Sequence, residues 1–294
     1  MKLLKAGLPK VLVIFFFFAL AALTLTSCAR NKTLQVKGSD TIVNMAQALA
    51  ERYMQENPSV PIAVTGGGSG TGIAALINKN ADIALASREM KKSEIEIAVK
   101  NGVYPNEIQV GSDGVAVITS YENPMNKLTV EQLSGIFTGK LEDWKELGWS
   151  GKKIVALSRD RNSGTHVFFL ENIVKLGDKK NKNEFGSGVL MLPSTQAIVE
   201  EVVSNPEAIG YIGLGYITPK TKVLAIAVGE KGPFIIPDES TSANGEYPIS
   251  RPLYFYTNGK PKGVIKEFIN FVYTKEGQEI VKDMGFVPLR VKTR

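Results

Sequence analysis

The stretch Val36–Pro58 reads VKGSDTIVNMAQALAERYMQENP and predicts one strand–turn–helix unit of an α/β fold. A strand-like segment runs into the polar turn Gly38–Thr41, after which apolar side chains recur every three or four residues, as they do on the buried face of a helix. The helix is expected to stop at Pro58, because proline has no amide hydrogen and does not continue a helix.

The same alternation of strand and helix continues along the chain. Strands are expected at residues 34–38, 61–65, 82–86, 108–119, 154–158, 209–214, 223–228 and 251–257, and helices at 42–57, 73–78, 129–137, 163–176, 195–204 and once or twice within 263–282. Strands that alternate with helices favour parallel pairing and the α/β class.

The length and net charge of the chain limit the classes of function that it can have. The chain has 294 residues, enough for two domains that each bury a core. Its formal charge is +6, but without Lys2, Lys5 and Lys10 there are 32 basic residues against 29 acidic ones, a net charge of about +3. This balance is too mild to predict a nucleic-acid partner, while a weak positive field favours capture of an anion.

The first 27 residues have the character of a secretory signal peptide. A short basic segment precedes the apolar run Val11–Leu25, which is shorter than the roughly 20 residues that span a membrane. The run ends in Leu25-Thr26-Ser27-Cys28, which resembles the bacterial lipoprotein box. We therefore expect residues 1–27 to be removed and Cys28 to carry lipid.

Cys28 is the only cysteine, so a disulfide within one chain is impossible. An uncleaved anchor helix and a signal peptide without lipid are the alternatives. With the lipid anchor, the protein is expected on the extracytoplasmic face of a bacterial membrane, because two or three acyl chains make attachment effectively permanent.

Three predicted strand-to-helix turns combine glycine with small hydroxyl residues, at positions 38–41, 68–72 and 159–165. Free backbone N–H groups and the helix dipole attract anions at such helix starts. Helix capping alone explains any one of these turns. Three of them, with arginines nearby and at the carboxyl ends of strands, predict an anion site. Neither a P-loop nor a dinucleotide-binding glycine motif is present.

Several longer segments resemble the phosphate-binding component of bacterial phosphate ABC importers. They are VKGSDTIVNMAQALAERYMQENP, GGGSGTGIAALINKNADIALASREM, SRDRNSGTHVFF, SNPEAIGYIGLGY and RPLYFYTNGKPKGVIKEFINFVYTKEGQEIVKDMGFVPL. The resemblance implies a type II periplasmic-binding-protein fold, in which two α/β lobes joined by two crossing segments close over one anion. We expect lobe 1 at residues 33–111 plus 251–294, lobe 2 at 112–250, and crossings near 111–116 and 247–253.

The resemblance also implies a set of ligand-binding residues. In lobe 1 these are the hydroxyl-bearing residues Ser39, Thr41, Ser69 and Ser87. In lobe 2 they are Arg159 and the helix start Ser163, Gly164 and Thr165.

One position departs from the family pattern. The best-known members carry an aspartate after the serine of the third turn, and it accepts the proton of hydrogen phosphate, whereas this chain has Arg88. Asp40 is the expected substitute for that acceptor, ahead of Glu89, and Arg88 is expected to add a second cation. The alternatives are that Asp40 caps a helix and that Arg88 is a solvated surface residue.

The leading hypothesis is a monomeric receptor that binds inorganic phosphate with high affinity and delivers it to a membrane permease and its ATPase. The alternatives are a receptor for another oxyanion such as sulfate, a phosphoester hydrolase at the same site, and an adhesion or signalling protein. No metal or other cofactor is expected, since one cysteine and one histidine make no zinc constellation. An enzyme is not expected either, because no Gly-x-Ser-x-Gly elbow is present and His166 is the only histidine.

Overall fold

The computed structural model describes residues 33–149 and 152–290. The predicted signal peptide and Cys28 lie outside these residues. Within the described ranges, no helix combines the length and the apolar character needed to cross a membrane.

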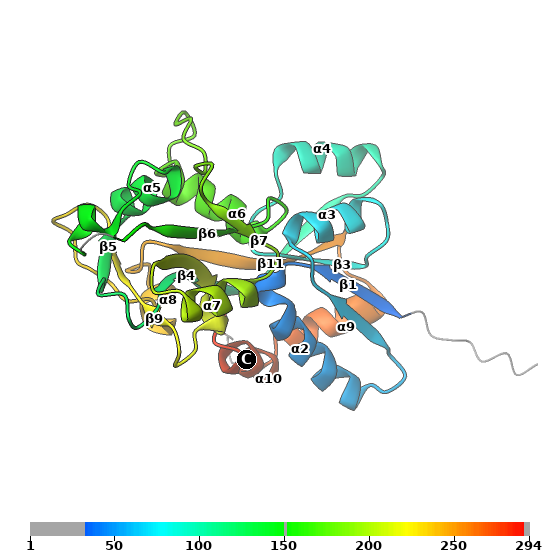
Figure 1. Cartoon of the computed structure of the whole chain (residues 1–294). Helices are drawn as coiled ribbons and strands as arrows, with labels where there is room; N and C mark the ends of the chain where they lie inside the picture. The colour runs from blue at the N-terminus through cyan, green and yellow to red at the C-terminus, as the bar shows by residue number, and fades with distance from the viewer. Residues whose placement is uncertain (1–32, 150–151, 291–294) are drawn as a thin grey trace, which may run out of the picture. The chain divides into compact units, whose positions relative to one another are not determined.

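One mixed sheet runs through the described chain, with strands in the order β2-β1-β3-β11-β4-β8-β6-β7 and with β9 also paired to β4 (Figure 1). Its strands are β1 Leu34–Gly38, β2 Ile62–Thr65, β3 Ile83–Ala86, β4 Pro105–Thr119, β6 Val155–Arg159, β7 Leu190–Leu192, β8 Ala208–Gly213, β9 Lys222–Val223 and β11 Ser250–Asn258. Two short strands, β5 Lys127–Thr129 and β10 Ala225–Ala227, pair separately.

Pairing is parallel at both ends of the sheet and antiparallel in the middle. The strands β1, β2 and β3 are parallel, as are β6, β7 and β8. The two long strands β4 and β11 are antiparallel to each other and to their outer neighbours. The alternating pattern thus predicted parallel pairing correctly for the outer strands and wrongly for the centre.

Helices cover both faces of the sheet in Figure 1. They are α2 Val43–Glu56, α3 Ser69–Ile77, α4 Lys92–Lys100, α5 Val130–Thr138, α6 Gly164–Phe169, α7 Thr195–Ser204, α8 Glu239–Ala243, α9 Gly263–Val272 and α10 Lys275–Asp283. The helix expected at 163–176 is α6 continued by a π-helical turn, Leu170–Val174.

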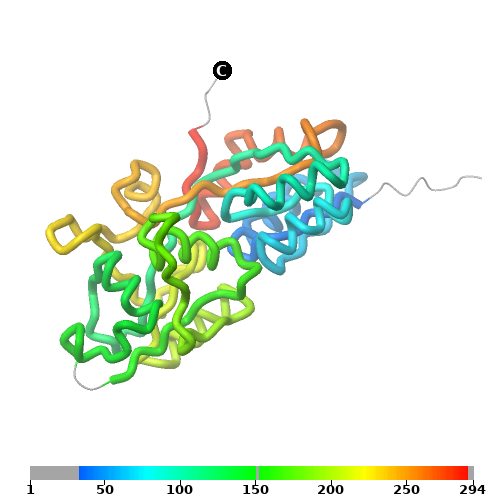
Figure 2. Tube along the Cα trace, turned by 90° about the horizontal axis from the view of Figure 1, so that it is seen from above, coloured from blue at the N-terminus to red at the C-terminus, as the bar shows by residue number. Residues whose placement is uncertain are grey.

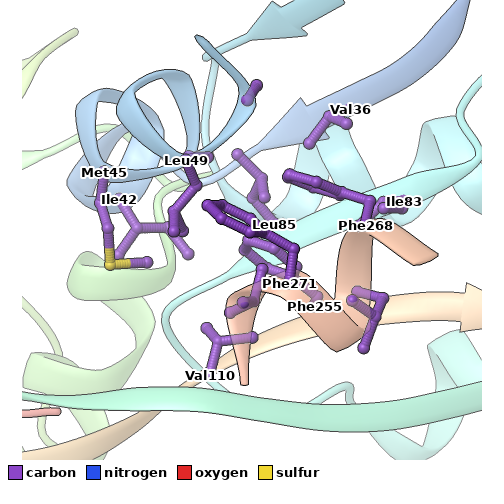
Figure 3. Close-up of a cluster of buried hydrophobic side chains, with 14 of the residues drawn as sticks. Val36, Ile42, Met45, Leu49, Ile83, Leu85, Val110, Phe255, Phe268 and Phe271 are labelled. Atoms are coloured by element: carbon purple, nitrogen blue, oxygen red, sulfur yellow. The ribbon is translucent and has the colours of Figure 1, made fainter. Parts of the chain in front are cut away.

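The buried hydrophobic side chains form four clusters, and each cluster contains residues of only one of the two expected lobes. Two clusters draw only on residues 34–110 and 253–286, and the larger packs α2 and α9 against β1, β3 and β11 (Figure 3). The other two draw only on residues 115–249. Each side of the molecule therefore has its own core, which supports the proposed division into lobes.

The strands β4 and β11 connect the two sets of cores. The partner of β4 is β11 up to Gly114 and β8 from Val115 onward, so one strand passes from one core to the other. The chain returns to the first core at the start of β11, where Val115 N donates a hydrogen bond to Ile249 O at 2.7 Å. Figure 2 shows the returning segment running alongside β4 toward the first core.

Candidate anion-binding site

Three serines of lobe 1 meet at one edge of the sheet. Ser39 follows β1 and Ser87 follows β3, and because these strands are parallel neighbours their carboxyl ends lie together. Ser39 Oγ donates to Ser87 Oγ at 3.0 Å, and Ser87 N donates to Ser69 Oγ, at the start of α3, at 3.1 Å. All three serines are buried.

Gly38 makes this meeting possible. Its φ is +145°, and a Cβ there would lie 2.2 Å from Leu85 O. Any side chain would therefore push β1 away from β3 and separate Ser39 from Ser87.

The start of α6 in lobe 2 packs directly against this group. Thr41 Oγ1 and Thr165 Oγ1 are 2.7 Å apart, a hydrogen bond between the lobes. A Cβ on Gly164 would lie 2.2 Å from Ser69 Oγ and 2.6 Å from Ser87 Oγ. Only glycine fits here, and the expected residues of both lobes thus lie together. We call Ser39, Thr41, Ser69, Ser87 and Thr165 the hydroxyl cluster.

The Ser163 hydroxyl bonds within its own helix rather than across the lobes. Its hydroxyl accepts from His166 N at 3.4 Å and caps α6. The cap holds the first turn of α6, and with it Thr165, in place against lobe 1.

Asp40 and Arg159 form an ion pair across the lobes. Asp40 Oδ2 lies 3.2 Å from Arg159 Nη2 and accepts from Thr195 N, the first residue of α7, at 2.9 Å. Asp40 is the first residue of the short 3-10 helix Asp40–Ile42, and its carboxylate binds the start of a helix in the other lobe. Arg159 also donates to Thr195 Oγ1 and to the carbonyls of Leu192, at the end of β7, and Pro193. Burial lowers the pKa of its guanidinium, an effect that Asp40 opposes.

Arg88 does not join the hydroxyl cluster. Its guanidinium forms a two-pronged pair with Glu94, with Nη1–Oε2 and Nη2–Oε1 distances of 2.8 and 2.7 Å. The residue is only 7% exposed, so it is not a solvated surface arginine either. Glu94 lies in α4, a helix that the sequence analysis did not predict, and so its partnership with Arg88 was missed.

A second buried arginine, Arg251, was also missed. Nη2 of Arg251 donates to Thr165 Oγ1 and Nη1 donates to Ser87 O, both at 3.0 Å. Its Nε and Nη2 also donate to Asp113 Oδ2 at 3.1 and 2.7 Å. Opposite charges within the two apolar strands expected to cross between the lobes were the signal that would have found this pair, because buried charges need partners.

The arrangement is suited to holding an oxyanion. The hydroxyl cluster supplies donors whose present partners are largely one another. His166 lies apart from this cluster, with Nδ1 3.1 Å from Ser158 Oγ, and burial lowers its pKa to about 4. A Ser-His-Asp triad places a carboxylate on the histidine ring, whereas among the described residues the His166 ring contacts Ser158 and Phe185 and bonds no carboxylate, so these residues do not form a triad. In the described part of the chain, no three His, Cys, Asp or Glu side chains gather as metal ligands.

Two α/β lobes with separate cores, two crossing strands and polar turns that face each other define a solute-binding protein of the periplasmic-binding type. Residues 26–276 match the PBP superfamily domain. The expected fold class is thereby confirmed.

Known proteins narrow the family further. The chain is 33% identical over 273 residues to the phosphate-binding protein PstS of Pseudomonas aeruginosa, covering 87% of this chain and 82% of the relative. It is 29% identical over 289 residues to that of Borreliella burgdorferi, covering 95% and 99%. The chain belongs to the PstS family of phosphate-binding proteins, as its sequence motifs predicted.

Solved structures agree with this assignment. A protein of Clostridium perfringens described as a phosphate ABC transporter substrate-binding protein, solved with bound phosphate, superposes with a TM-score of 0.77 at 28% identity, covering 88% of this chain and all of that one. An ABC-type phosphate transport receptor of Vibrio cholerae gives a TM-score of 0.70 at 28% identity, covering 87% and 100%.

Proposed function

We propose that this protein binds inorganic phosphate outside the cytoplasm and delivers it to the permease and ATPase of an ABC importer. The observation that carries the proposal is the hydroxyl cluster, in which buried serines and threonines from both lobes converge on one another. The names of the family's members support phosphate as the ligand, and the convergence of these hydroxyls supports the cluster as the place where this chain holds it.

Phosphate binds by exchanging partners within the cluster. The hydroxyls that now bond one another turn toward the phosphate oxygens, and the two lobes remain joined through the anion. A hydrogen bond to a charged group contributes about 1.5–3 kcal/mol, and micromolar affinity corresponds to about 8 kcal/mol. Three to five such bonds from the cluster therefore account for a receptor of that affinity.

Asp40 is the proposed reader of the phosphate proton, and Arg159 supplies the countercharge beside it. Their ion pair lies next to Thr41, and one carboxylate oxygen, Oδ2, already has its partners in Arg159 and Thr195. An ionised carboxylate repels sulfate, which carries no proton, and accepts a hydrogen bond from hydrogen phosphate.

Titration calorimetry with phosphate, sulfate and arsenate tests the function and this selectivity. We expect the wild type to bind phosphate and arsenate and to reject sulfate, and Asp40→Asn to narrow the gap between phosphate and sulfate. Asp178→Asn, in an exposed loop of lobe 2, is the matched control and should leave the gap unchanged. Equal wild-type affinity for sulfate and phosphate would overturn the phosphate assignment.

The protein is proposed to release its ligand unchanged, as a receptor rather than an enzyme. His166, the single histidine that a histidine-dependent hydrolase would have to use, is buried beside Ser158 and Phe185, with its ring stacked on Phe185 at 4.6 Å. Phosphomonoesters incubated with the pure protein should yield no more phosphate than buffer alone does.

We further propose that the protein is a monomer anchored by lipid at Cys28 on the extracytoplasmic face of the membrane. The sequence Leu25-Thr26-Ser27-Cys28 and the polar residues that follow support the anchor. Mass spectrometry should find diacylglycerol on Cys28 of the mature protein, and Cys28→Ala should accumulate as precursor or appear in the soluble fraction. A wild-type protein without acyl mass that partitions into the aqueous phase would contradict the anchor.

A further inference from the structure

Arg251 lies at the point where both lobes and both crossing strands meet. It is 3% exposed and stands directly opposite Asp113 in the register of β11 and β4. From there its guanidinium reaches the turn after β3 through Ser87 O and the start of α6 through Thr165 Oγ1. Among the arginines of the described chain, it is the one that bonds to two of the turns that build the hydroxyl cluster.

The bond to Thr165 fixes the direction of a hydroxyl proton. A guanidinium only donates hydrogen bonds, so Thr165 Oγ1 must accept at the contact with Arg251. The single hydroxyl hydrogen of Thr165 then points away from Arg251, to the side where Thr41 Oγ1 lies at 2.7 Å. Donation from a cation also polarises the hydroxyl and strengthens it as a donor.

We propose that Arg251 is a positioning residue of the anion site, which holds the Thr165 hydroxyl as a donor to the bound oxyanion and ties it to the Ser87 turn. The inference rests on the proposed function and deepens it, because it assigns a role to a residue outside the three anion-binding turns. Arg251 acts on the anion through Thr165 rather than by direct contact.

The surroundings of Arg251 keep its guanidinium in one orientation. Asp113 Oδ2 accepts from two of its nitrogens, while Oδ1 accepts from Leu214 N at 2.9 Å. The ring of Phe168 lies 5.3 Å from the guanidinium carbon. Lysine keeps the charge, but one ammonium group cannot reproduce the planar fork that serves Asp113, Ser87 and Thr165 together.

A double-mutant cycle tests whether Arg251 works through Thr165. Phosphate affinity is measured by titration calorimetry for the wild type, Arg251→Lys, Thr165→Val and the double variant. We expect each single change to weaken phosphate binding about tenfold, and the double variant to bind within about threefold of Thr165→Val, because the second change removes a contact already lost. Arg52→Lys, on the surface of α2, is the control for the exchange itself and should leave affinity unchanged.

A structural role alone gives a different result. In that case Arg251→Lys lowers the midpoint of urea unfolding, and its effect on affinity multiplies with that of Thr165→Val. Multiplying effects, or an unchanged affinity in Arg251→Lys, would overturn the inference while leaving phosphate binding by the wild type intact. So would coupling of Thr165→Val to Arg88→Lys instead.

Asp113→Asn provides a second variant if Arg251→Lys does not fold. It leaves Arg251 in place but weakens its anchor, and we expect its loss of affinity to be coupled to Thr165→Val in the same way. A wild type that binds none of phosphate, arsenate or sulfate would overturn the proposed function, and the inference with it.

Discussion

At the residue scale, Gly164 has no room for a side chain where the start of α6 meets lobe 1. A methyl group there would collide with Ser69 and Ser87 of the opposite lobe. We expect Gly164→Ala to weaken phosphate binding at least tenfold, because the start of α6 can no longer approach lobe 1. Gly188→Ala is the matched control, since a Cβ there meets nothing within 4 Å. Titration calorimetry that finds equal affinities for the two variants would show that the lobes do not approach this closely around the ligand.

His166 makes stability depend on pH. Burial of the ring lowers its pKa from 6.5 to about 4, so the fold favours the neutral form. The stabilisation is complete above pH 6.5 and is lost as the pH falls from 6.5 toward 4, on the order of 2 kcal/mol by pH 4.5.

The test compares urea unfolding of the wild type and of His166→Gln at pH 7 and pH 4.5. Carboxylates titrate in both proteins, so the difference between their losses of unfolding free energy gives the contribution of His166, the only histidine. We expect the wild type to lose more free energy of unfolding than the variant over this interval. Equal losses would mean that the ring becomes charged in the folded protein without penalty.

At the residue scale, the sequence predicted which residues gather but not how charges pair. The turns that carry Ser39, Ser69 and the α6 start were found because each lies at a strand end or helix start, which local sequence reveals, whereas Ser87 was expected only from the resemblance to the family. The partner of Arg251 was not found because that ion pair joins segments far apart in the chain, and the partner of Arg88 was not found because it lies in α4, which the periodicity did not predict. Arg251 and Asp113 are separated by 138 residues.

At the element scale, periodicity predicted the long helices and failed for short or exposed elements. The helix α2 was expected at residues 42–57 and is observed at Val43–Glu56. The helix α4 was missed because Ile95, Ile97 and Val99 recur at every second residue, which is not the spacing of an apolar helix face, and all three are exposed in the structure. The three-residue β7 was missed because a segment that short shows no clear alternation.

The central pair of strands shows why local pattern does not determine topology. The strand β4 was expected at residues 108–119 and extends over Pro105–Thr119, but its antiparallel pairing with β11 joins segments more than a hundred residues apart. Pairing between such distant segments depends on the tertiary fold. Here the antiparallel pair lets two strands pass between the cores side by side, and it carries Asp113 and Arg251 to the edge of the site.

At the scale of the whole molecule, hydrogen bonds hold the two lobes against each other. Asn162 of lobe 2 is the clearest case outside the hydroxyl cluster. Its side-chain amide donates to Gly67 O at 2.8 Å and to Thr71 Oγ1 at 3.2 Å, and its backbone carbonyl accepts from Gly70 N. These bonds exist only while the glycine-rich turn of lobe 1 lies against lobe 2, so they favour the closed arrangement without being part of the cluster.

We therefore expect Asn162→Ala to weaken phosphate binding about five- to tenfold through the closure equilibrium, since a hydrogen bond contributes about 0.5–1.5 kcal/mol and affinity scales with the closed fraction. Solution scattering should show a slightly smaller radius of gyration for the wild type on addition of phosphate, as hinge closure requires. The variant should reach the same final radius, but only at higher phosphate concentration. Asn172→Ala, whose amide bonds Phe168 O within lobe 2, should follow the wild-type titration. A wild-type scattering profile that does not change at saturating phosphate would show that binding proceeds without closure, and the contacts of Asn162 would then have no bearing on affinity.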